Sequence, residues 1–389
     1  MTSVSSVNRR ILAIWFPLLP AERIRRREQN SAAPDELPLV LAGKSENALR
    51  VFAVDRLAAK LGLYPGLSLA DARARVQPLR VVEADEQADR ALLNSIADWC
   101  DRFTPLVALD PPHGIFLDIS GCAHLFQGER AMAETIAGDL QAFGLTARYA
   151  IAGTAAAARA LTRDVSGTIA APGEEAEAVS PLPVTAFTGE HAVVVALKRA
   201  GLKTIGEAAG RSRQELRARF GGDFVFMLDQ VLGRADAPIS PRLPVPDYIA
   251  EQRFPEPVAT GEVIERTLFA LSATMSKRLE ERGKGARALE AAFFRTDGAV
   301  RRIGIETGRP LKEAKTIVKL FRERLDALAD PLDPGFGFDL IRLSAYRVEN
   351  FTYEAASFDA NAQDAHEISS LVDQLSARYG AACVLRFHA

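Results

Sequence analysis

The sequence predicts a multidomain α+β protein, and three observations support this prediction. A chain of 389 residues is long enough for two to four domains. Its 48% hydrophobic and 25% charged residues are typical of ordinary globular cores. Two stretches rich in Pro, at 171–184 and 233–248, divide the chain into three segments. The first and last segments mix strands and helices, and the middle segment is helical.

The first segment predicts a small α+β layer. Its strands are short apolar runs, and its helices show helical spacing with recognisable ends, such as a cap at Ser68 and a stop at Gly62. Ile96 and Trp99 fall on the inner face of the longest helix. Strands are predicted at 9–16, 37–43, 106–110, 114–119 and 147–153, and helices at 54–62, 69–76, 86–103, 128–143 and 154–163.

The middle segment predicts three helices. The first ends at Gly201, the turn "GLKTIG" carries Lys203, and Ser212 caps the third helix. This pattern resembles a helix-hairpin-helix module, which binds nucleic-acid phosphates through main-chain amides at a glycine turn. A plain three-helix bundle fits the pattern nearly as well.

The last segment predicts a compact α/β domain with β-α-β-like packing. Helices are expected at 262–282 and 311–328, and strands at 288–296, 300–307 and 339–351. Beyond them, a further helix with an apolar face and a closing strand are expected. That face is formed by Ile368, Leu371, Val372 and Leu375.

Composition argues against secreted and membrane proteins. The three cysteines, Cys100, Cys122 and Cys383, are far apart and lack CxxC spacing, so neither a disulfide framework nor a zinc site is predicted. The apolar stretch near the N-terminus is short and is interrupted by Pro17 and Pro20, which favours a buried strand over a signal peptide. No apolar run approaches the roughly 20 residues of a membrane span. We therefore expect a soluble cytoplasmic protein.

The charge is unevenly distributed. The net charge is −2, yet residues 266–324 contain 15 Lys or Arg against 7 Asp or Glu. A basic segment in an otherwise acidic chain suggests a polyanionic partner. A solvated helix face with mixed ion pairs is the alternative interpretation.

The order of these parts resembles the Y-family translesion DNA polymerases over nearly the whole chain. The most specific match is "AAKLGLYPGLSLADA" at 58–72, which resembles the fingers of that family. The resemblance implies a right hand of palm, fingers and thumb, followed by a little finger. It assigns residues 8–24 and 78–172 to a ferredoxin-like palm, 25–77 to fingers, 173–236 to a thumb, 237–250 to a linker, 251–353 to a little-finger-like DNA-binding domain and 354–389 to a C-terminal extension.

The resemblance is weakest at the residues that carry chemistry. Phosphoryl transfer by two metal ions needs carboxylates close together. In the family they come from an Asp-x-Asp in the first strand and a Ser-x-Asp-Glu turn before "FLD". Other residues stand at the corresponding positions here: Trp15 and Pro17 in the strand, His113 and Gly114 in the turn, and Arg56 and Ala59 where fingers residues hold the incoming triphosphate.

The resemblance therefore implies a pseudo-polymerase without metal or cofactor. His113 alone is a poor magnesium ligand, because imidazole favours zinc or copper. Asp118 is expected to be structural. Two alternatives stay open: an active polymerase that uses displaced carboxylates such as Asp110 and Asp118, and a protein-interaction module that does not contact DNA.

The resemblance to inactive members of that family implies that this protein acts in bacterial SOS-induced translesion synthesis and mutagenesis, close to the nucleoid. The implied partners are DNA, the sliding clamp, a RecA-like accessory protein and a C-family error-prone polymerase. Relatives continue beyond the equivalent of residue 389, so we expect a truncated chain. Residues expected to contact DNA phosphates are Lys203, Arg295, Arg301, Arg302, Arg309, Lys312 and Lys315. A weak clamp-binding peptide is expected around Glu354, Ser357 and Phe358.

Overall fold

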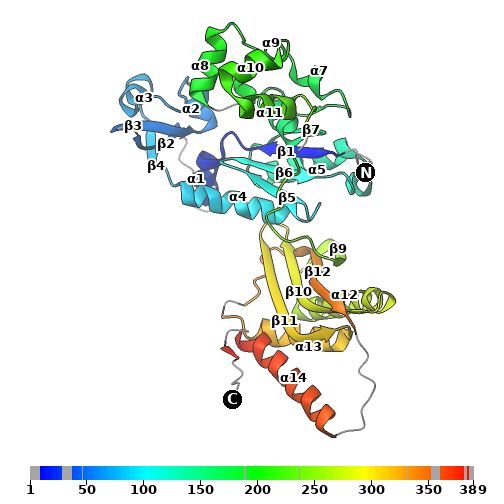
Figure 1. The fold of residues 1–389 in the computed structure, drawn as a ribbon. Coiled ribbons are helices and arrows are strands. Elements are labelled where there is room, and N and C mark those ends of the chain that lie inside the picture. Colours follow the sequence, from blue (N-terminus) through cyan, green and yellow to red (C-terminus); the bar gives the residue numbers. More distant parts are fainter. Residues whose placement is uncertain are drawn as a thin grey trace. The chain divides into compact units, whose positions relative to one another are not determined.

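A computed structural model (Figure 1) describes residues 9–28, 37–45, 47–187, 190–235, 237–329, 331–351, 360–380 and 383–384. The chain forms two compact units, Met1–Arg242 and Leu243–Ala389. The division falls inside the predicted linker, 237–250.

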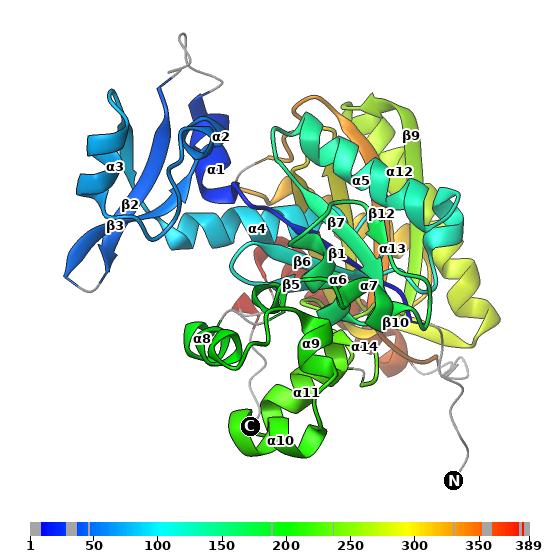
Figure 2. The ribbon, with the colours of Figure 1, turned by 90° about the horizontal axis from the view of Figure 1, so that it is seen from above.

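A five-stranded sheet with β1 at its centre forms the core of the first unit. The strand order is β5-β6-β1-β7-β8, and β1 is antiparallel to both of its neighbours (Figure 2). The first four residues of β1 are buried, as expected for a central strand. The strands are β1 (Ile11–Trp15), β5 (Val107–Asp110), β6 (Gly114–Asp118), β7 (Arg148–Ala152) and β8 (Thr168–Ile169).

Helices pack around this sheet much as predicted. In α4, Asp85 caps the first turn by accepting a hydrogen bond from the Ala88 amide, and Ile96 and Trp99 are buried, which confirms the predicted inner face. The Trp99 ring meets Phe103 edge-on at 5.1 Å. The helices are α1 (Leu19–Glu28), which was not predicted, α4 (Glu86–Cys100), α5 (Glu129–Ala142) and α6 (Ala155–Thr162), with a 3-10 turn at Ala123–Phe126.

A small second sheet carries the segment that resembles fingers. Its order is β3-β2-β4, with β4 parallel to β2. Asp55 and Ser68 cap the two following helices through their side chains, and the Ser68 cap confirms the predicted helix start. The elements are β2 (Leu39–Ser45), β3 (Ala48–Val54), α2 (Arg56–Lys60), α3 (Leu69–Arg75) and β4 (Arg80–Glu83).

The helical segment contains more helices than predicted. Thr204 and Ser212 cap helices as their positions suggested. A further helix begins at Gly222, directly after Gly221, although the sequence pattern presents two adjacent glycines as a stop rather than a start. The helices are α7 (Glu175–Val179), α8 (His191–Arg199), α9 (Ile205–Ala209), α10 (Arg213–Phe220) and α11 (Gly222–Val231), with a 3-10 turn at Val184–Ala186.

The second unit is a four-stranded sheet with two helices on one face (Figure 1). Its order is β11-β10-β12-β9, and all three pairings are antiparallel, so the expected β-α-β packing of an α/β domain is corrected to an antiparallel α+β layer. Strand β9 was missed because most of its residues are polar or proline. The elements are β9 (Tyr248–Val258), α12 (Gly261–Glu281), β10 (Lys284–Arg295), β11 (Val300–Leu311), α13 (Ala314–Asp326) and β12 (Phe338–Asn350).

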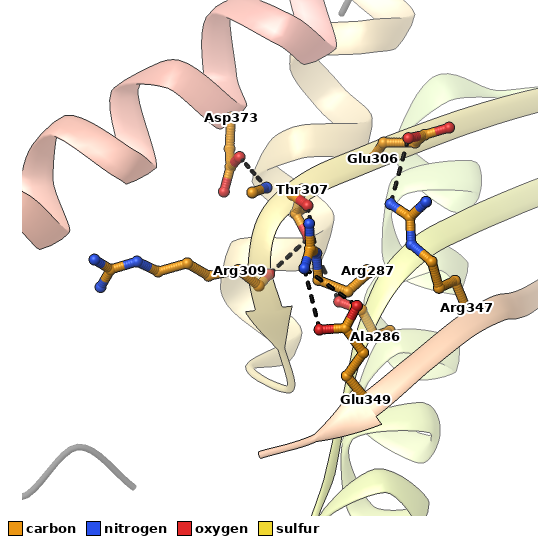
Figure 3. A network of polar contacts seen from close by, with 9 residues as sticks. Ala286, Arg287, Glu306, Thr307, Arg309, Arg347, Glu349 and Asp373 are labelled. Carbon is orange, nitrogen blue, oxygen red and sulfur yellow. Dashed lines mark hydrogen bonds and ion pairs between the residues drawn. The ribbon is translucent and has the colours of Figure 1, made fainter. Parts of the chain in front are cut away.

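The last helix, α14 (Ala360–Tyr379), lies along α13 and the edge strand β11. Figure 3 shows the Asp373 carboxylate directed at the end of β11, where it accepts a hydrogen bond of 2.7 Å from the Gly308 amide. Edge strands expose unpaired amides, which can pair with other chains. Helix α14 covers the edge strand β11.

The predicted apolar face of this helix points away from its own unit. Ile368 and Leu371 are 62% and 55% exposed, whereas Asp373 and Ala377 face inward. The predicted closing strand lies mostly outside the described residues. In the described part of the chain, no helix combines the length and the apolar character needed to cross a membrane.

Candidate functional site

The end of β1 brings the two degenerate sequence motifs together. Trp15 lies opposite Gly114 of β6 and Arg148 of β7. The next amide, that of Phe16, donates a hydrogen bond of 2.8 Å to the His113 carbonyl. Pro17 follows and is partly buried. We call this region the palm rim and define it by Trp15, Asp110, His113, Gly114, Arg148, Arg159 and Arg163.

The turn of the palm rim is closed around Gly114. A Cβ atom added there would lie 2.9 Å from both the backbone oxygen and the Oδ2 atom of Asp110. Such a distance is too short for a carbon in contact with an oxygen. A glutamate therefore does not fit this backbone without a shift of the turn.

Arginine side chains converge on Trp15. The Arg163 guanidinium lies 4.0 Å from the centre of the Trp15 ring, and that of Arg148 lies 5.6 Å from it. Cations within about 6 Å of an indole face are attracted by its π electrons. Arg148 also donates to the Arg163 and Asp164 carbonyls, at 3.5 and 3.4 Å.

The palm rim contains a single acidic side chain, which offsets only part of this positive charge. Arg159 donates to the Asp110 carboxylate at 3.2 Å, and the Asp110 side chain is only 14% exposed. Within the described residues, no three His, Cys, Asp or Glu side chains are grouped so that they could hold a metal ion. The palm rim is thus a cluster of three guanidinium groups and one carboxylate.

The remaining titratable group of the palm rim is neutral at pH 7. Burial lowers the pKa of His113, the charge of Asp89 raises it, and Arg163 lowers it further. Burial also lowers the pKa of Arg163; Asp110 opposes this effect and Arg159 adds to it. In both groups burial is the largest cause of the lowered pKa, and an aspartate opposes it.

Asp118 does not belong to the palm rim. It lies at the other end of β6 from Gly114, which pairs with Asp110. Four residues of strand separate the two positions by about 13 Å, whereas two catalytic metal ions lie about 4 Å apart. The Asp118 carboxylate accepts hydrogen bonds from the amide and hydroxyl of Ser120, at 3.0 and 2.5 Å. Asp110 and Asp118 therefore cannot serve one two-metal site in this arrangement.

The predicted fingers positions lie on α2. Arg56 is exposed and donates to the Thr146 hydroxyl at 3.1 Å, and Ala59 is exposed one turn further on. Thr146 is in turn held by the Glu22 carboxylate. Arg56 thus contacts the segment that leads into β7.

The glycine turn at 201–206 does not offer its amides to a phosphate. The amides of Lys203 and Thr204 both donate to the Glu207 carboxylate, at 2.6 and 3.0 Å. The next two donate to the carbonyls of Leu182 and Ser180. These amides are therefore occupied, which corrects the helix-hairpin-helix interpretation. The Lys203 side chain is exposed.

The predicted DNA contacts of the second unit follow the edge strand β11 and do not gather on one face. Arg301 lies opposite Phe293, on the helix-covered face, and Arg302 opposite Ala292, on the other. Arg302 pairs with Glu290 at 2.7 Å. Arg309 is exposed near the far end of β11 (Figure 3).

The other predicted contacts flank this strand. Arg295 is held by Asp297 and Asp333, at 2.5 and 2.8 Å. Lys312 pairs with Glu280 at 3.1 Å, and Lys315 is exposed in the first turn of α13. Glu354, Ser357 and Phe358, the predicted clamp-binding residues, lie outside the described residues.

Sequence reasoning missed the three arginines of the palm rim. Arg159 and Arg163 are four residues apart and therefore share one side of the chain as it leaves α6. Arg148, Arg159 and Arg163 are the only charged residues of the run "ARYAIAGTAAAARALTR". Three cations in an otherwise uncharged run beside Trp15 were a signal that could have been used.

The strand order, the fingers-like sheet and the helical segment together define a Y-family DNA polymerase-like protein. Two solved structures share this architecture: DinB from Sulfolobus solfataricus, with a TM-score of 0.50 at 14% identity over 87% of this chain and 98% of that one, and a post-insertion binary complex of Dbh DNA polymerase, with a TM-score of 0.51 at 14% identity over 87% and 99%.

Sequence comparison gives the family itself. Residues 25–163 match the impB/mucB/samB family and residues 246–364 match its C-terminal domain. Protein ImuB of Caulobacter vibrioides (strain NA1000 / CB15N) is 37% identical over 325 residues, which cover 82% of this chain and 70% of that protein. DNA polymerase IV of Dehalococcoides mccartyi (strain CBDB1) is 25% identical over 65% of this chain and 66% of that protein. The chain belongs to the impB/mucB/samB family and is similar to Protein ImuB.

Proposed function

We propose that the chain is a non-catalytic, Y-family polymerase-like scaffold that binds DNA in bacterial SOS-induced translesion synthesis and mutagenesis. In this role it bridges DNA, the sliding clamp, a RecA-like accessory protein and an error-prone C-family polymerase that performs the synthesis. It acts in the cytoplasm, close to the nucleoid. Similarity to Protein ImuB supports the proposal.

The observation that carries the proposal is the chemistry of the palm rim. Magnesium ions in a phosphoryl-transfer site need several hard oxygen ligands. The palm rim supplies one carboxylate, Asp110, and it is already paired with Arg159. By the resemblance, Trp15, Pro17, His113 and Gly114 stand where the family places its carboxylates, and none of these four residues is a carboxylate.

A primer-extension assay tests the absence of catalysis. The chain is incubated with primer-template DNA, all four deoxynucleotides and Mg²⁺ or Mn²⁺, alongside an active polymerase of the family. We expect no extension by this chain. Extension that is lost in Asp110→Ala or Asp118→Ala, measured on folded protein, would contradict the proposal.

A salt titration tests DNA binding through the second unit. We expect affinity for primer-template DNA to fall steeply with salt, because phosphate contacts release counterions. Arg301→Glu with Arg302→Glu is expected to weaken binding by at least about tenfold. Arg266→Glu, at an exposed position of α12, is the matched control. Equal affinity of the wild type and the double variant would refute this part.

A pull-down tests the bridging role. The chain, and a version extended at its C-terminus, are presented to purified clamp, RecA-like protein and C-family polymerase. We expect all three to be retained by at least one version, and Phe358→Ala to reduce clamp retention. If neither version retains any of the three proteins, the bridging role is refuted and only DNA binding remains of the proposal.

A further inference from the structure

The arginine cluster of the palm rim has the properties of an anion site. It consists of Arg148, Arg159 and Arg163, gathered from β7, from α6 and from the residue that follows α6. Arg148 and Arg163 lie at the Trp15 ring, and Arg159 lies at Asp110. Guanidinium groups from two elements therefore border one small area at the end of β1.

The neighbouring carboxylates do not neutralise this cluster. Asp110 is shared with Arg159. Asp89 is paired with the buried Arg23 at 2.6 Å, and Glu22 is taken by Thr146. Three guanidinium groups facing one carboxylate leave an excess of two positive charges, which repels a free divalent cation and attracts an anion.

The arginines are also held in place before any ligand arrives. Arg163 lies 4.0 Å from the centre of the Trp15 ring, Arg159 is paired with Asp110 at 3.2 Å, and Arg148 makes two long hydrogen bonds, of 3.5 and 3.4 Å, to carbonyls just beyond α6. Ordered guanidinium groups lose less conformational freedom on binding, and their planar fork matches two oxygens of a phosphate. The same fork discriminates poorly between phosphates of different origin.

We propose that Arg148, Arg159 and Arg163, beside Trp15, form a site that binds phosphate groups directly, without a divalent metal ion. The phosphates come either from a free nucleotide or from the backbone of a DNA strand. This goes beyond the proposed function, in which the second unit supplies the DNA contacts. In a metal-dependent polymerase site Mg²⁺ assists nucleotide binding, whereas here Mg²⁺ weakens it, because the ion neutralises the charge that the arginines recognise.

The test uses the full chain in EDTA at low salt and follows tryptophan fluorescence. Trp15 reports on the cluster because Arg163 covers its ring; the other tryptophan, Trp99, is 1% exposed. The probes are inorganic pyrophosphate, dATP and a short single-stranded oligonucleotide. We expect a saturable change with at least one probe, its loss in Trp15→Phe, and weaker binding when excess Mg²⁺ replaces EDTA.

Two variants and one control assign the site. Arg159→Gln and Arg163→Gln are each expected to weaken binding by about tenfold or more, since each removes a charge-assisted hydrogen bond. Arg130→Gln removes one charge from an exposed position on α5, where the side chain is 64% exposed, and is expected to leave binding unchanged. Thermal melts confirm that the compared variants are folded.

The outcomes separate the two sources and can overturn the site. Binding of pyrophosphate and dATP identifies a nucleotide site, and binding of the oligonucleotide alone identifies a strand phosphate. No saturable change with any probe, equal affinity in both cluster variants, or binding that requires Mg²⁺ would overturn the proposal. A chain that binds DNA only through Arg301 and Arg302 fails this test and still satisfies the proposed function.

Discussion

The palm rim and the β9–β12 sheet place their arginines in opposite electrostatic settings. On the sheet, arginines have carboxylate partners: Arg302 has Glu290, Arg342 has Glu251, and Arg295 has both Asp297 and Asp333. On the palm rim, Arg159 is paired with Asp110, whereas Arg148 and Arg163 lie at the Trp15 ring. The segment with the larger basic excess in sequence is the better neutralised one in space. Charge counted along a chain therefore does not show where positive charge is available.

The largest expected effect comes from forcing a carboxylate back into the palm rim. Gly114→Glu places a Cβ within 2.9 Å of two Asp110 oxygens, so the turn must move. We expect a loss of about 2–3 kcal/mol in the free energy of unfolding, measured by urea denaturation of the first unit's transition. His113→Asp, at the neighbouring partly buried position, replaces a larger side chain with a smaller one; it is the control and should cost less. Equal stability of Gly114→Glu and the wild type would show that the turn is not closed.

The second effect comes from removing the shared carboxylate. Asp110→Asn leaves Arg159 without its ionic partner and raises the excess charge of the palm rim from two to three. We expect a loss of about 1–2 kcal/mol in stability, because Arg159 is partly exposed and water compensates in part. We also expect tighter phosphate binding in EDTA. Weaker phosphate binding by a folded variant would contradict the electrostatic account of the cluster.

The third effect tests the neutralised side of the comparison. Glu290→Gln releases Arg302 from its 2.7 Å pair. Since this pair is about one quarter exposed, we expect a stability loss below about 1 kcal/mol. DNA affinity should rise a few-fold, and the slope of log affinity against log salt should steepen by about one. Glu262→Gln, which releases Arg266 on an exposed helix face, is the control.

Local sequence patterns were sufficient for most elements of the fold. Ser68, Thr204 and Ser212 begin helices because their side chains accept amide hydrogen bonds, a property of a few adjacent residues. Strand β9 and helix α11 were missed because their local patterns contradict their structure. Pro255 and Pro257 interrupt the strand, and two adjacent glycines, Gly221 and Gly222, stand at the start of the helix. Tertiary packing overrode local preference at both.

The site was predictable only in part, for a related reason. Trp15 and Gly114 could be placed together by resemblance, and the sheet register does so. The arginine cluster depends on the register of β7 and on where α6 ends, and neither could be predicted from a single sequence. Sequence reasoning likewise grouped Arg301 with Arg302, although alternation along a strand places them on opposite faces. That the amides of the 201–206 turn are already hydrogen-bonded could be seen only in the structure.

The smallest effects concern two carboxylates of the second unit with pKa values shifted in opposite directions. Burial raises the pKa of Asp373; the Gly308 hydrogen bond and the charges of Arg287 and Arg309 oppose it. A raised pKa means that the docked form of α14 binds the proton more tightly. Its stabilisation is thus complete below the ordinary value of 3.8 and is lost as the pH rises through the raised pKa. Asp373→Asn, which resembles the protonated acid, should therefore be more stable than the wild type at pH 7, and the difference should shrink towards pH 4.

Asp333 gives the matched comparison with the opposite sign. A hydrogen bond from Gly335, followed by Arg295, lowers its pKa, so its contribution is present above the ordinary value and is lost as the pH falls through the lowered one. Asp333→Asn should be less stable than the wild type at pH 7. Thermal unfolding of the three chains from pH 7 down to below the ordinary carboxyl pKa of 3.8 measures both trends. If both variants are less stable than the wild type at pH 7, burial does not dominate at Asp373. The charges of Arg287 and Arg309 would then outweigh the cost of burying the Asp373 carboxylate.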